Sequence, residues 1–193
     1  MQRLIQDLKS GDFKKIYLLY GQEAYLRKQY KDKLKEAMIG DDTMNFSYYE
    51  GKDFTVGEVI DQAETMPFFA DRRLILIENS GLFKSGGEQM AEYLKSPAES
   101  VNFLFVETEV FKAVQANGCA VEFATQDETT LKRWILQMIK KENKNISERT
   151  LNLLLEKTGT DMENIHKECE KLFCYCLDKD VITEQDVEAI CTK

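Results

Sequence analysis

Short apolar runs alternate with segments of helical periodicity through the first two thirds of the chain. The runs typical of buried strands are residues 15–20, 46–49, 74–77, 101–106 and 120–123. Between the first two, Leu26, Tyr30 and Leu34 repeat at helical spacing, and Thr55 with Glu58 matches a capping box that starts a further helix. This alternation predicts an α/β domain with a mostly parallel, five-stranded sheet and flanking helices.

Strand periodicity stops near Thr125, and every later segment is predicted to be helical. Leu131, Ile135 and Ile139 lie on one helical stripe, and Ser147 is placed to cap the next helix. The sequence therefore predicts two domains, an α/β domain over residues 1–125 and a small helical bundle over residues 126–193.

The stretch Thr65-Met-Pro-Phe-Phe-Ala-Asp-Arg-Arg73 joins a predicted helix to the strand at 74–77. Pro67 disfavours helical dihedrals at Met66, which indicates a helix end. The adjacent Phe68 and Phe69 either fill the core or form an exposed pair that inserts into a partner, with residues 71–73 as a polar rim. The residues alone favour the core, because most phenylalanines are packed inside proteins.

The overall charge argues against independent binding to nucleic acid. The formal net charge is −8 and the pI is near 4.9, so the chain does not by itself attract polyanions. Binding to DNA shared with basic partners remains open. No apolar run is long enough to span a membrane and the N-terminus has no signal-peptide profile, so no membrane partner and a cytoplasmic location are expected.

Metal and thiol chemistry have little support in the sequence. The five cysteines, at positions 119, 169, 174, 176 and 191, lack zinc-finger spacing. An odd number without an export signal predicts reduced, buried thiols instead of a disulfide framework. The one histidine, His166, is predicted to be a helix-surface residue, and no metal site is expected.

A nucleotide site is also not predicted, although the turn after the first strand is where one would lie. A phosphate loop requires two glycines followed by Lys-Ser or Lys-Thr. Gly21 is present, but Leu26 replaces the second glycine and Glu23 would place a carboxylate near a phosphate. Glu78 at the end of a strand is interpreted as a solvated carboxylate. We therefore expect no cofactor and no catalytic activity from this chain alone.

Three stretches, residues 16–26, 63–74 and 131–135, give the chain a resemblance that extends over its whole length. The sequence resembles the delta subunit of the bacterial DNA polymerase III clamp loader. The resemblance implies an AAA+-like α/β domain without a working nucleotide site, followed by a helical lid. It also implies that a hydrophobic pair binds the ring-shaped sliding clamp and opens it. The matching residues are Phe68 and Phe69, flanked by Met66, Pro67 and Ala70.

The resemblance further implies the partners and the setting. These are the sliding clamp (beta subunit), the other clamp-loader subunits (gamma/tau and delta prime), and DNA within the assembled complex. The resemblance also implies that ATP is bound and hydrolysed by partner subunits. The chain would belong to a DNA-directed DNA polymerase, a nucleotidyltransferase by complex membership, acting in DNA replication at the nucleoid. Members of this family carry a third, collar domain, so a chain that stops at Lys193 is expected to be a fragment. The family also has a longer connection after the strand at 101–106, and whether residues are omitted between Glu107 and Phe111 stays open.

Two alternatives stay open at this point. One is an AAA+ protein that hydrolyses ATP with an unusual loop. The other is a clamp-loader-like adaptor that acts on a different partner.

Overall fold

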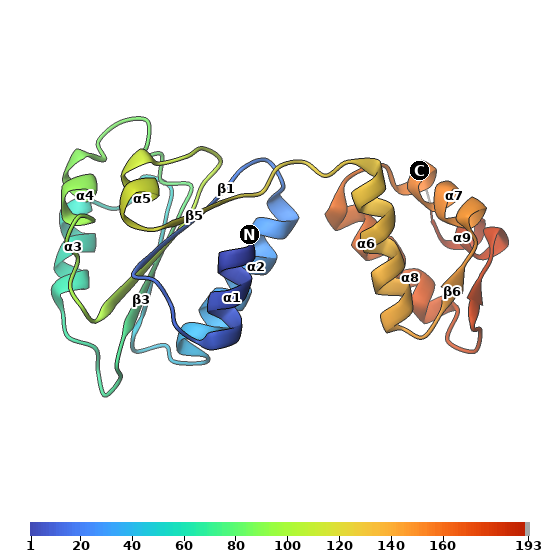
Figure 1. Cartoon of the computed structure of the whole chain (residues 1–193), viewed down its shortest axis with the longest axis horizontal. Helices are drawn as coiled ribbons and strands as arrows, with labels where there is room; N and C mark the ends of the chain where they lie inside the picture. The colour runs from blue at the N-terminus through green and yellow to red at the C-terminus, as the bar shows by residue number, and fades with distance from the viewer. Residues whose placement is uncertain (192–193) are drawn as a thin grey trace. The chain divides into compact units, whose positions relative to one another are not determined.

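The computed structural model describes residues 1–191, and the chain divides into two compact units, residues 1–125 and the chain from Gln126 onward. Figure 1 shows helices on both faces of a sheet in the first unit and a cluster of helices in the second.

The first unit is built on five parallel strands, as the alternating pattern predicted. They are β1 (Ile16–Tyr20), β2 (Phe46–Glu50), β3 (Arg73–Glu78), β4 (Val101–Val106) and β5 (Cys119–Glu122), in the spatial order β2-β3-β4-β1-β5. Every neighbouring pair is parallel. The three central strands are almost fully buried, which explains why they are continuous apolar runs.

Helices cover both faces of this sheet (Figure 1). They are α1 (Gln2–Ser10), α2 (Ala24–Ile39), α3 (Val56–Glu64), α4 (Glu88–Tyr93) and α5 (Lys112–Asn117). Alternate residues of β1 point to opposite faces, so Tyr17 packs in the core beneath α1 and α2. Its neighbour Leu18 packs in the core beneath α3, α4 and α5. The sheet is therefore packed on both faces. The loops that precede the strands lie at one edge of the sheet, where the strands begin, and the loops that follow them lie at the opposite edge, where the strands end.

The second unit contains α6 (Glu128–Lys141), α7 (Glu148–Thr158), α8 (Met162–Tyr175) and α9 (Glu184–Ile190). It also contains two short parallel strands, β6 (Asn145–Ile146) and β7 (Val181–Ile182), so the prediction that every segment here is helical was wrong. Two residues are too few to show strand periodicity. The buried Nζ of Lys144 donates to the main-chain oxygens of Cys176 and Lys179, which brings the two loops together.

The cysteines follow the prediction with one correction. All five are free thiols and four are buried, but Cys174 on α8 is exposed. Burial raises the pKa of Cys169 to about 12 and that of Cys191 to about 11. Because the thiolate is the reactive form, the buried thiols are doubly protected, by lack of access and by protonation.

A thiol reagent is therefore expected to modify one cysteine per native chain at neutral pH. Mass spectrometry after a short incubation with iodoacetamide should place the label on Cys174, and the Cys174→Ser variant should remain unlabelled. Labelling of Cys169 or Cys191 at a comparable rate in the native protein would contradict the packing of the second unit.

Candidate functional site

The loop between α3 and β3 presents an exposed apolar cluster. The exposed fractions are 83% for Met66, 57% for Phe68 and 96% for Phe69, which is the highest value among the large hydrophobic residues that the structure describes. The two phenylalanine rings pack edge to face, with centroids 4.6 Å apart. We call residues 66–70 the hook. Its phenylalanines are not core residues, so the interpretation favoured by the residues alone was wrong.

Local sequence explains where the hook begins. The capping box predicted at Thr55 and Glu58 is present, with the Thr55 hydroxyl accepting from the Glu58 N–H and the carboxylate accepting from the Thr55 N–H. The helix that it starts, α3, ends at Glu64, and Thr65 before Met66 and Pro67 is already extended. The chain then turns sharply, and Phe69 adopts a left-handed conformation with φ +49°. A non-glycine residue in this region is uncommon and needs support from its surroundings.

That support comes from a residue that sequence analysis missed. Asn45, at the end of the loop before β2, is 1% exposed and hydrogen-bonds both main-chain polar groups of Phe68. The two residues are 23 positions apart, so no local pattern links them. Only the pairing of β2 with β3 brings them together.

The predicted polar rim is only partly present. Asp71 and Arg72 are outside the core, and the Arg72 guanidinium lies 5.5 Å from the centre of the Phe13 ring. Arg73, however, is 5% exposed, so its assignment to the rim was wrong. It is the first residue of β3 and pairs with Val101 within the sheet, which buries it.

The opposite edge of the sheet holds the glycine turn where a nucleotide would be expected. Gly21 has φ +117°, and a Cβ added there would lie 2.4 Å from the main-chain oxygen of Phe123. The N–H of Glu23 donates to that same oxygen at 2.9 Å. The turn is thus packed against the end of β5, and this amide is bonded to protein and not directed at a phosphate.

Four charged side chains at this edge have partners within the protein. Glu78 pairs with Lys31 at 3.0 Å and its side chain is 13% exposed, so it is not the solvated carboxylate that was predicted. Glu107 is buried, which raises its pKa, and it accepts from the N–H and hydroxyl of Ser80 at 2.8 and 2.6 Å. Arg27 donates to the main-chain oxygen of Glu107. Arg27 and Lys31 are thus engaged within the protein.

A hollow of about 420 Å³ lies at the ends of β1 and β5 on this edge. Its lining includes the carboxylates of Glu109 and Glu122 and no basic side chain. Glu109 is paired with Lys84 at 2.7 Å, so among the described residues Glu122 is the carboxylate of this lining without a cationic partner. It repels a polyphosphate, and the adjacent turn offers no lysine to bind one. The residues of this edge do not fit the phosphates of a nucleotide.

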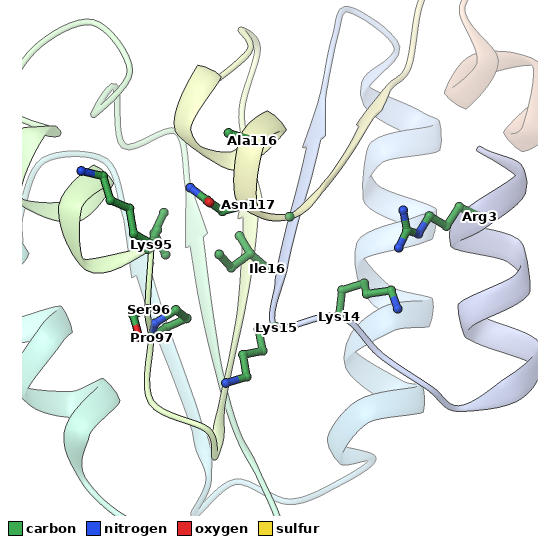
Figure 2. A pocket seen from close by; sticks show the side chains of 11 residues that line it. Arg3, Lys14, Lys15, Ile16, Lys95, Ser96, Pro97, Ala116 and Asn117 are labelled. Carbon is green, nitrogen blue, oxygen red and sulfur yellow. The ribbon is translucent and has the colours of Figure 1, made fainter.

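A second hollow, of about 540 Å³, is lined by positive side chains and lies at the same edge as the hook. It is formed by the segments that precede β1, β4 and β5, and its basic residues are Arg3, Lys14, Lys15 and Lys95. In Figure 2, Lys14 and Arg3 lie on one side and Lys95 on the other, and the three lysines point in different directions. The cations form a positive surface and do not converge on a single anion.

Other functional features are weak within the described part of the chain. No group of three or more His, Cys, Asp or Glu side chains among the described residues could hold a metal ion. The His166 side chain is 34% exposed on α8, and its Nδ1 lies 3.7 Å from a carboxylate oxygen of Glu170. Across residues 1–191, no helix combines the length and apolar character needed to cross a membrane.

Comparison with known proteins assigns the family. A family model described as the delta subunit of DNA polymerase III matches residues 17–123, which is more than half of the chain. The chain belongs to the DNA polymerase III delta subunit family. The resemblance found in the sequence is therefore confirmed, and the matched region includes the hook.

Curated relatives in this family are distant but extend over nearly all of the chain. DNA polymerase III subunit delta of Bacillus subtilis (strain 168) is 23% identical over 205 residues, covering 96% of this chain and 59% of the relative. A probable DNA polymerase III subunit delta of Aquifex aeolicus (strain VF5) is also 23% identical, covering 91% of this chain and 54% of the relative. The chain thus spans little more than half the length of these delta subunits.

Solved structures show the same fold. The DNA clamp loader delta protein of Bacillus subtilis superposes with a TM-score of 0.72 at 22% identity, over 98% of this chain and 62% of that one. The Thermotoga maritima RuvB branch migration motor gives a TM-score of 0.57 at 11% identity, over 98% of this chain and 66% of its own. This delta-family chain therefore has an AAA+-like fold, as the family resemblance implied.

Proposed function

We propose that this chain is a clamp-opening subunit of the DNA polymerase III clamp loader. In this proposal Phe68 and Phe69 insert into the protein-binding pocket of the ring-shaped sliding clamp, with Met66, Pro67 and Ala70 beside them. The observation that carries the proposal is the exposure of this aromatic pair in a family whose members are clamp-loader subunits. A large apolar group held in water by a folded protein is typical of a binding site.

The size of the hook is consistent with an interface anchor. Burying one phenylalanine contributes roughly 1.5–3 kcal/mol, so the pair contributes about 3–6 kcal/mol before the costs of association. Aromatic anchors of this kind carry most of the affinity in many interfaces, while the surrounding contacts exclude water.

Ring opening then follows from differential binding. A subunit shifts the equilibrium between closed and open clamp only as far as it binds the open ring more tightly. The hook would bind a clamp surface whose geometry changes when one interface of the ring parts. Under this proposal no chemical step occurs on the chain itself.

We assign ATP binding to partner subunits of the clamp loader, because the strand-end residues here do not fit phosphates. In the assembled complex the positive surface around Lys14, Lys15 and Lys95 is where we place contact with the DNA backbone, since four basic residues gather in the lining of this hollow. The chain would be a subunit of the polymerase holoenzyme without carrying the polymerase activity itself. It would act in the replisome in the cytoplasm.

Titration of the purified chain against the sliding clamp of the same organism tests the proposal, with ATP present and absent. We expect binding that does not depend on ATP. Turnover of ATP by the chain would favour the ATPase alternative. A folded chain that does not bind the clamp would favour an adaptor for another partner.

A further inference from the structure

We propose that Asn45 is a positioning residue for the hook, holding its main chain so that Phe68 and Phe69 are presented before a partner arrives. This inference rests on the proposed function, because it concerns how the same surface is prepared for binding.

The donors and the acceptor of the Asn45 side chain all form hydrogen bonds, either to the hook or to Asp42. Its Oδ1 accepts from the Phe68 N–H at 2.6 Å. Its Nδ2 donates to the main-chain oxygen of Phe68 at 2.9 Å and to Oδ2 of Asp42 at 2.7 Å. An amide side chain has two N–H donors and one carbonyl acceptor, so both donors and the acceptor are engaged.

Asn45 is itself anchored to the sheet. Its main-chain oxygen accepts from the N–H of Leu74 at 2.9 Å, next to the pairing of Phe46 with Leu74 where β2 meets β3. The side chain is buried, with 1% of the residue exposed. The main chain of Asn45 is hydrogen-bonded to β3 and its side chain to Phe68. The hook is therefore held in a fixed position relative to the sheet.

Asp42 orients this arrangement from the other side. One carboxylate oxygen accepts from the main-chain N–H groups of Met44 and Asn45 at 2.9 and 3.1 Å, and the other accepts from the Asn45 side chain. The hydrogen bond from the Asn45 side chain is the main cause of a lowered pKa for Asp42. The carboxylate therefore stays charged at neutral pH and fixes the orientation of the amide, with Nδ2 toward Asp42 and the Phe68 main-chain oxygen and Oδ1 toward the Phe68 N–H.

The hook needs such a restraint because its side chains do not provide one. Phe69 is almost completely exposed and its left-handed main chain is unfavourable for a residue with a Cβ. A conformation of this kind persists where the surroundings determine it, and the hydrogen bonds at Phe68 are the nearest constraint. A segment ordered in advance binds more tightly, because ordering is not required at the moment of association.

The first test is the affinity of the Asn45→Ala variant for the sliding clamp. If only about a tenth of the variant molecules present the hook correctly, the apparent dissociation constant rises about tenfold. The matched control is Asn102→Ala. Asn102 is also buried, at 7% exposure, and its Nδ2 donates to the main-chain oxygen of Lys14 at 2.8 Å, without touching the hook. The control is expected to lose similar stability and to bind within about twofold of wild type.

The second test separates positioning from general destabilisation. In a background carrying Phe69→Ala, the additional effect of Asn45→Ala on affinity should shrink, because both changes act on the same element. Equal effects in both backgrounds, or an effect no larger than that of Asn102→Ala, would overturn the inference.

A third measurement does not involve the partner. The Phe68 amide hydrogen should exchange with solvent faster in Asn45→Ala, and at the wild-type rate in Asn102→Ala. If Asn45→Ala does not fold, Asp42→Ala takes its place with an expected loss of about threefold in affinity. Failure of wild type to bind the clamp would defeat the proposed function, while unchanged Phe68 exchange in the variant would defeat the positioning role alone.

Discussion

Replacing Phe68 and Phe69 together with alanine is expected to weaken binding to the sliding clamp by at least about a hundredfold. The two rings contribute about 3–6 kcal/mol when buried in a partner, and 1.4 kcal/mol corresponds to tenfold in affinity. In the free chain both rings face solvent, so the free energy of unfolding should change by less than about 0.5 kcal/mol. Titration of the labelled clamp and urea unfolding of the same preparations give the two quantities.

The second unit offers a matched control for this variant. Tyr175 and Leu177 are also exposed, at 52% and 76%, and lie at the end of α8. The Tyr175→Ala/Leu177→Ala variant removes a comparable exposed apolar pair and should bind the clamp as wild type does. If the two double variants lost affinity equally, apolar surface in general and not the hook would account for binding.

Changing Gly21 to alanine is expected to destabilise the first unit by about 3 kcal/mol. The added Cβ would lie 2.4 Å from the main-chain oxygen of Phe123, and overpacking of this kind typically costs about 1–3 kcal/mol. The φ of +117° adds about 1–3 kcal/mol for any residue with a Cβ. Urea unfolding followed by circular dichroism measures the loss.

Gly11 separates the two causes. It also has a positive φ, +74°, but a Cβ there would meet no atom within 4 Å. The Gly11→Ala variant should therefore lose only about 1–2 kcal/mol, from its main-chain conformation. Equal losses at the two positions would mean that the turn after β1 is not packed against Phe123 and is free to approach a phosphate.

The sheet was predictable because its central strands are buried on both faces. Such strands are short apolar runs, and the helices between them show a different period. β6 and β7 were missed because each has only two residues and depends on the buried Nζ of Lys144, a contact between distant segments.

The hook illustrates a different limit. The sequence located its aromatic pair and its helix end, but the residues alone favoured burial of Phe68 and Phe69, and only the family resemblance favoured exposure. Exposure depends on the turn at Phe69, which follows the hydrogen bond between Phe68 and Asn45, a residue of the distant loop before β2. Arg73 and Glu78 were misplaced for a related reason, since the burial of a charged residue depends on neighbours in the sheet.

Release of a labelled clamp from nicked circular DNA tests most directly whether this chain opens the sliding clamp without nucleotide. A closed ring leaves such a circle slowly, so we predict that wild-type chain accelerates release in the absence of ATP. The Phe68→Ala/Phe69→Ala variant should leave the release rate unchanged, and Tyr175→Ala/Leu177→Ala should act like wild type. A wild-type chain that binds the clamp tightly but does not accelerate its release would contradict the account.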